Sequence, residues 1–299
     1  MESKFDDTRL LSYSDADLIS YITSLPPLPN YSNIIPLSSK YLAKGHTEDE
    51  VEDVVRSMEF ASQLGIRIPH IHRIVWADSG PFCVMDRVPG TTLDIAWPEL
   101  GWISSLRLAF QLRRVIRRLR SATSTSAGSL ASGECRSYFL EDRFGLPPRA
   151  NFHHINAFLN FWANFTSIRH EIKKTPAEHA ICPRPMFSCN RPFVFTHHDL
   201  APRNIVLDHE GQLWIIDWDE AGFYPRFFEY AGMYNFIRAW DRLALWRWKL
   251  CAWIAAGVYD KEWHMLERIR YRFTRFSVAR RFNMKANGYA AVAGRPDCE

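Results

Sequence analysis

The chain of 299 residues lacks the features that mark several classes of protein. Its six cysteines form no C-x-x-C pair, which argues against a zinc site and a disulfide framework. No apolar run approaches the length of a membrane-spanning helix. The first residues are acidic where a secretory signal would be basic. We therefore expect a cytoplasmic protein without a membrane partner.

A strong charge of one sign is also missing. The net charge is +4 and the pI is about 8.7, too mild to indicate nucleic-acid binding. From Arg226 onwards there are 14 Lys and Arg against 7 Asp and Glu. We interpret this surplus as a solvated surface and expect no nucleic-acid partner. Because 47% of the residues are hydrophobic, the chain is not disordered.

What the chain does contain is an acidic motif in its second half. The run THHDLAPRN and the later run IIDW place Asp199, Asn204 and Asp217 at offsets of 5 and 13 residues. Two apolar stretches flank Gly211 between Asn204 and Asp217, and this pattern predicts a β-hairpin. A hairpin brings its ends together. Asn204 and Asp217 should therefore be neighbours, with Asp199 on the loop before them.

These residue types suit phosphoryl transfer. The reaction needs magnesium held against phosphates and a base aligned with the acceptor hydroxyl. Magnesium prefers oxygen ligands and keeps several waters, so Asn204 and Asp217 are the expected metal ligands. Asp199 is the expected base. We interpret His197 and His198 as residues that shape the loop.

The N-terminal part predicts a small β-rich lobe. Short strands are expected within residues 33–44, 68–76 and 82–85, with a helix between them that ends at Gly65. Lys44 closes one strand, where it would contact the phosphates of a nucleotide. The backbone of Asp86 and Val88 would meet the adenine edge. The break at Pro89-Gly90 then sets an N-lobe of residues 1–88 and a C-lobe of residues 89–299.

The pattern beyond that break is helical. Residues 106–120 form an amphipathic helix with one arginine-rich face, which we interpret as solvated. Apolar residues spaced over 155–172 predict one long core helix. Tryptophans at positions 240–263 fall in further helical stretches, and we interpret them as core residues. The fold class is therefore α+β.

At this point the motif resembles a known family. Together with Gly222–Pro225 and Phe228–Tyr230, it is similar to the aminoglycoside phosphotransferase and choline kinase-like group, which has a two-lobed protein-kinase-like fold. Three further segments resemble its fungal branch: Met58–Pro69, Val84–Leu93 and Leu140–Gly145. The resemblance implies ATP-dependent phosphorylation of a small-molecule hydroxyl. It also implies Asp199 as base, Asn204 and Asp217 on magnesium, and Lys44 on the phosphates.

Two departures from the family keep an alternative open. The family carries a glycine-containing loop between its first strands, whereas this chain has only Ser38-Ser39-Lys40 there and its first glycine is Gly45. Val54 stands where the family has the acid that pairs with the lysine, and Glu50, Glu52 and Asp53 are the candidate substitutes. The alternative is a degenerate kinase-like fold that binds nucleotide or a partner without catalysis. A nucleic-acid binder leaves the acidic motif unexplained.

The basic C-terminal quarter favours a neutral or anionic acceptor, because a cationic one would need an acidic pocket. Asp219, Glu220 and Glu229 follow the second carboxylate of the motif. They are either acceptor contacts or supports of the loop through Arg203 and Arg226, and we favour support. The acceptor itself and the oligomeric state are left open by the sequence.

Overall fold

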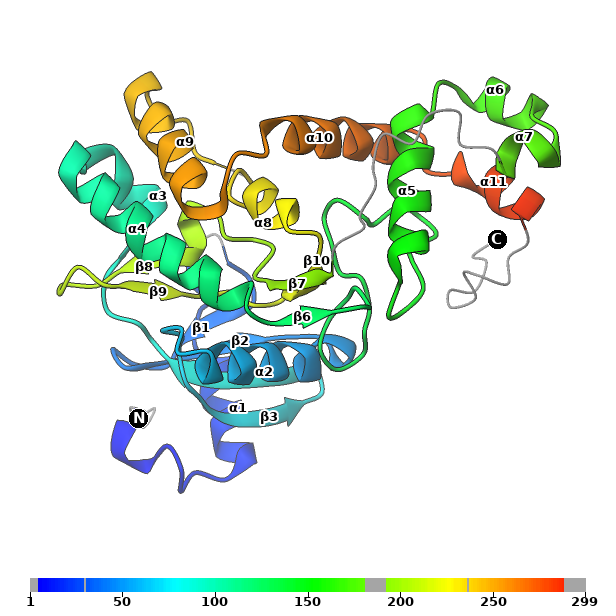
Figure 1. Cartoon of the computed structure of the whole chain (residues 1–299). Coiled ribbons are helices and arrows are strands. Elements are labelled where there is room, and N and C mark those ends of the chain that lie inside the picture. Colours follow the sequence, from blue (N-terminus) through cyan, green and yellow to red (C-terminus); the bar gives the residue numbers. More distant parts are fainter. Residues whose placement is uncertain (1–4, 30, 181–191, 236, 288–299) are drawn as a thin grey trace.

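The computed structural model describes residues 5–29, 31–180, 192–235 and 237–287. A four-stranded sheet with two helices makes up the N-terminal part, and the C-terminal part is mainly helical (Figure 1). This is the α+β architecture, with a β-rich N-lobe and a helical C-lobe, that the sequence predicts. None of the described helices is long and apolar enough to cross a membrane.

The N-terminal sheet is antiparallel, with the strand order β1-β2-β4-β3. Its strands are β1 (Ile34–Pro36), β2 (Tyr41–Gly45), β3 (Ile71–Ala77) and β4 (Gly80–Asp86). Successive side chains of a strand point to opposite faces. Val84 therefore packs with helix α1 (Asp15–Ser24), whereas Cys83 packs with α2 (Glu48–Gln63). Each face of the sheet is covered by one helix.

Local signals fix the ends of these elements. The Ser14 hydroxyl caps α1 by accepting the Asp17 N–H at 3.1 Å. Helix α2 ends just before Gly65, whose φ of +71° is a left-handed conformation that glycine adopts without strain. Strand β3 begins at Ile71, three residues later than expected, because Pro69 has no N–H to donate to a sheet.

Helices α4 (Trp102–Leu119) and α9 (Arg242–Ala256) lie side by side in the C-terminal part and run in the same direction (Figure 1). Near their starts, Arg247 donates to the Ser105 hydroxyl at 3.3 Å, and near their ends Arg120 donates to the Ala256 carbonyl at 2.7 Å. The predicted apolar face of α4 is buried: Leu108, Ala109, Leu112, Ile116 and Leu119. This face forms part of the largest core cluster.

The expected long helix over 155–172 is wrong at its centre. The chain forms α5 (Phe152–Asn164) and a separate α6 (Ile168–Lys173). Phe165 leaves the helical conformation with a ψ of 129°, and the Ser167 hydroxyl accepts the His170 N–H at 3.2 Å to start the next helix. Periodicity did not reveal the break because Phe165 stays buried on the same side.

The tryptophan prediction is correct only in part. Trp248 is fully buried in the core, as expected. Trp246 is 59% exposed. Trp240 precedes α9 and stacks on Trp97 at 6.4 Å between ring centroids. Tryptophan density alone did not separate the core face of α9 from its outer face.

Two small three-stranded sheets, β10-β7-β6 and β5-β8-β9, lie in the C-terminal part. Their strands are β5 (Thr91–Thr92), β6 (Thr123–Ser124), β7 (Phe193–Thr196), β8 (Ile205–Leu207), β9 (Leu213–Ile215) and β10 (Gly222–Tyr224). The remaining helices are η1 (Asp7–Arg9), α3 (Leu93–Ala96), η2 (Trp97–Glu99), α7 (Pro176–Ala180), η3 (Pro202–Asn204), α8 (Phe227–Gly232), α10 (Asp260–Arg275) and α11 (Arg280–Asn287).

Candidate active site

The predicted hairpin forms and brings the acidic motif together. Strands β8 and β9 pair antiparallel, and Gly211 turns between them with a φ of +74°. At the open end the Ile216 N–H donates to the Asn204 carbonyl at 3.0 Å. Asp217 comes next and has a φ of +68°, an uncommon conformation for a non-glycine residue that often marks a functional position. The hairpin therefore places Asn204 and Asp217 side by side.

Asp199 is held by three side chains. Its Oδ2 accepts from Arg203 and, at 2.8 Å, from the Nδ2 of Asn204. Its Oδ1 accepts from the Nδ2 of Asn235 at 3.1 Å. Arg203 also donates to the Asn235 carbonyl at 2.7 Å. Asn235 was not predicted, because it lies 36 residues away in irregular structure and belongs to no pattern.

The two histidines of the motif have structural roles, as expected. The His197 Nδ1 accepts the Asp199 N–H at 3.3 Å, so its Nε2 is the atom that donates to the Ile216 carbonyl at 3.0 Å. Burial lowers the pKa of His197, which is consistent with a neutral ring. This ring ties the loop that carries Asp199 to the strand that leads to Asp217.

A buried carboxylate supports the same loop from behind. The Glu229 oxygens accept the N–H of His197 at 2.9 Å and that of His198 at 3.2 Å. Glu229 is 1% exposed, and burial raises its pKa to about 7. Glu229 therefore supports the loop, as favoured from the sequence, although its side chain does so by accepting backbone N–H groups of the loop and not through Arg203 or Arg226.

Lys44 was expected to pair with an acid of α2, but its partners are two carboxylates at and just beyond the end of the hairpin. Its Nζ donates to Asp217 and to both oxygens of Asp219, at 2.8 and 2.7 Å. Burial alone would lower the pKa of Lys44, but the charges of Asp217 and Asp219 outweigh it and raise that pKa above its usual value. Lys44 is therefore a charged group.

None of the three acids proposed as substitutes for the missing helix acid reaches Lys44. Asp53 is 2% exposed and accepts the N–H of Ala131 at 2.8 Å and that of Ser132 at 2.9 Å. Glu50 caps the start of α2, and Glu52 pairs with Arg56 at 2.6 Å on the surface. The position of Asp53 makes it a link between α2 and the C-terminal part.

A cavity of about 320 Å³ lies between the N-terminal sheet and the hairpin. Five predicted nucleotide and metal residues line it: Lys44, Asp86, Val88, Asn204 and Asp217. The cavity also has apolar walls, which suit a planar base. Among the wall residues are Ile34, Leu42, Met85, Val206 and Ile216. Asp199 adjoins this cleft through Asn204.

We call residues 86–88, which connect the two lobes, the hinge, and this segment offers backbone groups to that cavity. The Asp86 side chain is occupied, because Oδ2 accepts the His70 N–H at 3.0 Å and Oδ1 lies 2.7 Å from the His72 Nε2. The Asp86 N–H donates to the His70 carbonyl at 3.0 Å, and the Asp86 carbonyl lies at the end of β4. Within the described part of the chain, the Val88 N–H has no hydrogen-bond partner.

Several carboxylates lie around Asp199, although Arg203 pairs with Asp199 and Lys44 pairs with Asp217. Burial raises the pKa of Glu220 to about 8, and the neighbouring carboxylates of Asp199, Asp217 and Glu141 add to the effect. The Oε2 of Glu220 is buried and accepts no hydrogen bond from the described residues. The expectation of a neutral or anionic acceptor, which came from the basic surplus of the C-terminal quarter, stays a prediction.

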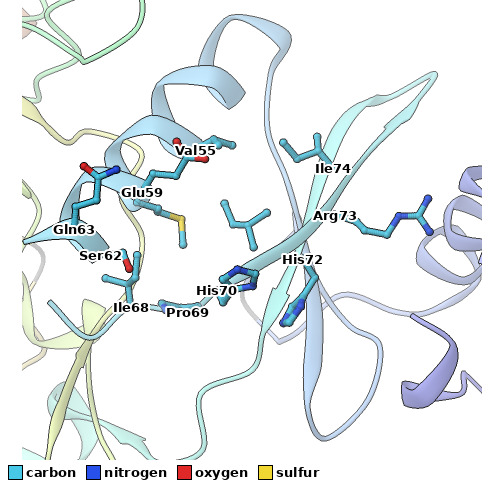
Figure 2. A pocket seen from close by; sticks show the side chains of 12 residues that line it. Val55, Glu59, Ser62, Gln63, Ile68, Pro69, His70, His72, Arg73 and Ile74 are labelled. Carbon is cyan, nitrogen blue, oxygen red and sulfur yellow. The ribbon is translucent and has the colours of Figure 1, made fainter. Parts of the chain in front are cut away.

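A larger cavity, of about 590 Å³, lies elsewhere, between α2 and β3. Figure 2 shows Glu59 and Ser62 of α2 on one side of it, and His72 of β3 with His70, which precedes that strand, on the other. It contains none of the predicted site residues and no second carboxylate beside Glu59. The acidic motif belongs to the smaller cavity.

Metal-binding capacity follows from the kind of atoms available. Within the described ranges, no three His, Cys, Asp or Glu side chains are grouped closely enough to hold a metal ion by themselves. Magnesium needs no such group, because one or two protein oxygens, phosphates and water complete its shell. The Nδ2 of Asn204 donates to Asp199, which leaves Oδ1 for a metal. The donor set of Asn204 and Asp217 therefore fits magnesium with a nucleotide.

The sheet-bearing lobe, the helical lobe and the cleft between them define a protein of the kinase-like fold class. The chain belongs to the phosphotransferase enzyme family, whose model matches residues 40–272. The resemblance seen in the sequence is thereby confirmed. No curated protein matches the chain.

Solved structures are similar in fold. A thermostable mutant of aminoglycoside phosphotransferase APH(4)-Ia in its apo form is 17% identical with a TM-score of 0.53, over 94% of this chain and 100% of that one. Choline kinase LicA from Streptococcus pneumoniae is 13% identical with a TM-score of 0.45, over 91% of each chain. Aminoglycoside phosphotransferase APH(3'')-Id from Streptomyces rimosus is 17% identical with a TM-score of 0.42, over 79% and 86%.

Proposed function

We propose that the protein is an ATP-dependent phosphotransferase that transfers the γ-phosphate to a hydroxyl of a small molecule. The observation that carries this proposal is the single cleft lined by Lys44, Asn204 and Asp217, with Asp199 hydrogen-bonded to Asn204 at 2.8 Å. Family membership supports the reaction class. The N-lobe of residues 1–88 and the C-lobe of residues 89–299 would close on the nucleotide from two sides.

The nucleotide would lie with its adenine against the hinge. The Asp86 carbonyl would accept from the base, and the Val88 N–H, which has no partner among the described residues, would donate to it. Lys44 would turn from Asp219 to the phosphates, exchanging one anionic partner for another. Magnesium, held by Asn204 and Asp217, would neutralise the developing charge on the phosphates.

Asp199 would orient the acceptor hydroxyl and take its proton. Arg203 and Asn235 hold the carboxylate in one orientation, so its direction is fixed before the acceptor arrives. Glu220 lies in the same charged neighbourhood.

The second candidate is a kinase-like fold that binds nucleotide without transfer. Two observations favour it. Lys44 already has two carboxylate partners, and no acid of α2 reaches it to hold it toward the phosphates. The turn before β2 is short, and the N–H groups of Ser38, Lys40 and Tyr41 already have partners within it, so few are available to cover the phosphates.

The test combines thermal shift with ADP release. Magnesium and ATP should raise the melting temperature, since a ligand of the native state stabilises it. Asp199→Asn should keep that rise and lower ADP release with a panel of hydroxyl metabolites by about 100-fold or more. Asp78→Asn, which removes an exposed carboxylate outside the cleft, is the matched control.

Each outcome assigns one function. A thermal shift without ADP release from any metabolite would establish the second candidate. Absence of a shift at millimolar ATP would exclude both. If Asp199→Asn released ADP as fast as the control variant, Asp199 would not be the base.

A further inference from the structure

A pocket of about 660 Å³ lies between α4, the connection from α2 to β3 and the tip of the β8–β9 hairpin. Its lining shares no residue with the nucleotide cleft. Four of its lining residues are arginines and none is Asp or Glu. We call it the arginine pocket, after Arg67, Arg107, Arg114 and Arg118.

The arginines face the pocket because of their spacing on α4. Arg107, Arg114 and Arg118 are separated by 7 and 4 residues, which places them on one side of a helix. Gln111 lies among them and donates to the Gly211 carbonyl at 2.9 Å, which fixes the hairpin tip against α4. In Figure 1, α4 lies between α9 and this hairpin. The α4 side chains and the hairpin tip therefore form one wall of the pocket, held together by this hydrogen bond.

The positive charge of this wall is neutralised only in part by the described residues. Within the part of the chain that the structure describes, Arg107 and Arg114 have neither an ion pair nor a hydrogen-bond partner. The charge of Arg67 acts on Asp208, but that carboxylate already accepts the N–H of Glu210 at 2.9 Å and that of Gln212 at 2.8 Å. Arg118 donates only to the Gly65 carbonyl. All four arginines are exposed, so water screens part of their mutual repulsion, and an anion bound among them would remove more of it.

We propose that the arginine pocket binds an anion that carries several phosphate groups. Arginine suits phosphate because its planar donors form paired hydrogen bonds with two oxygens. The volume admits a small molecule or a lipid headgroup. The half-exposed ring of Phe110 forms an apolar edge of the pocket beside the arginines.

Such an anion would join the two parts of the molecule. Arg67 lies on the connection from α2 to β3, whereas Arg107 and Arg114 belong to the C-terminal part. The Arg67 carbonyl accepts the Ile215 N–H at 2.9 Å, two residues before Asp217. Binding at the arginine pocket therefore bears on the strand that leads to the nucleotide cleft.

The probe is inorganic tripolyphosphate, with binding measured by calorimetry on the full chain. Arg107→Gln/Arg114→Gln should bind it at least tenfold more weakly. The matched control is Arg117→Gln/Arg281→Gln, which removes the same charge from exposed positions outside the pocket. It should change the affinity less than twofold. Lys44→Met should also keep the affinity, because Lys44 belongs to the other cavity.

A second arm separates a soluble anion from a headgroup. If the natural ligand is a headgroup, vesicles of phosphatidylcholine that contain phosphatidylinositol bisphosphate should sediment the protein, and tripolyphosphate should compete with them. If the protein binds tripolyphosphate but not the vesicles, the natural ligand is a soluble anion. The proposal is overturned if both double variants lose affinity equally, if Lys44→Met abolishes binding, or if neither probe binds.

Discussion

Gly232 offers a test of how closely the loop of Asp199 is packed. It is the last residue of α8, and a Cβ placed on it would lie 2.2 Å from the His198 carbonyl oxygen and 2.8 Å from its carbon. His198 itself has a φ of +71° and is fully buried, so its backbone has little freedom to retreat. Gly232→Ala should therefore displace the loop that carries Asp199.

Helix propensity alone predicts that Gly232→Ala stabilises the protein. Alanine stabilises a helix by about 1 kcal/mol relative to glycine. Here nonbonded atoms must return to a separation of about 3 Å or more, which requires a backbone shift of about 1 Å. Overpacking of this kind costs about 1–3 kcal/mol. The melting temperature should fall by about 2–6 °C, and a displacement of this size near the chemistry costs about 100-fold in rate.

Thermal and urea unfolding of Gly232→Ala measure the effect, with Gly101→Ala as the matched control. Gly101 is the residue before α4, and a Cβ there would meet no atom within 4 Å. Alanine is less favourable than glycine at this helix N-cap, so the control should unfold about 1–2 °C below the wild type. If Gly232→Ala is as stable as the wild type or more stable, the close packing of α8 against His198 is refuted.

Two further variants test supports of the site. Burial raises the pKa of Glu229 from 4.5 to about 7, so between these pH values Glu229 is protonated in the folded protein and ionised in the unfolded one. The free energy of unfolding should therefore fall by up to about 3 kcal/mol as pH rises through this window. Urea titrations of Glu229→Gln should no longer show this dependence on pH. An unchanged slope would contradict this. Asp53→Asn should lower the free energy of unfolding by about 1–3 kcal/mol, because it loses a charged acceptor of two N–H groups, yet keep the thermal shift with ATP. If Asp53→Asn instead abolished the thermal shift with ATP, Asp53 would be the partner of Lys44 in the nucleotide-bound protein.

The sequence predicted the site best where local geometry decides it. The hairpin between Asn204 and Asp217 follows from two apolar strands and Gly211, and it formed as expected. The capped start of α1 and the glycine end of α2 were also predictable, because backbone N–H groups and left-handed conformations demand particular residues. The break at Phe165 was not, since burial of the ring preserved the helical pattern.

Partners across the fold were beyond the sequence. Three acids of α2 lie near the position expected for the partner of Lys44. Asp53, however, accepts the N–H of Ser132, and Lys44 pairs with Asp217 and Asp219. Likewise, Asn235 reached Asp199 from an irregular segment. Side-chain pairing depends on where whole elements dock, and residue spacing carries no information on docking.

The sequence by itself determined which chemical groups the site contains: carboxylates, a carboxamide and a lysine. Their spacing also predicted that a hairpin would bring the carboxamide and one carboxylate together and that the lysine would end a strand. Only the tertiary structure decided their charge environment. It placed Glu220 in the acidic neighbourhood of Asp199 and gathered Arg107 and Arg114 around a separate pocket. The physical reason is that charge acts through space, so its effect depends on distances and burial that are fixed only when the lobes pack.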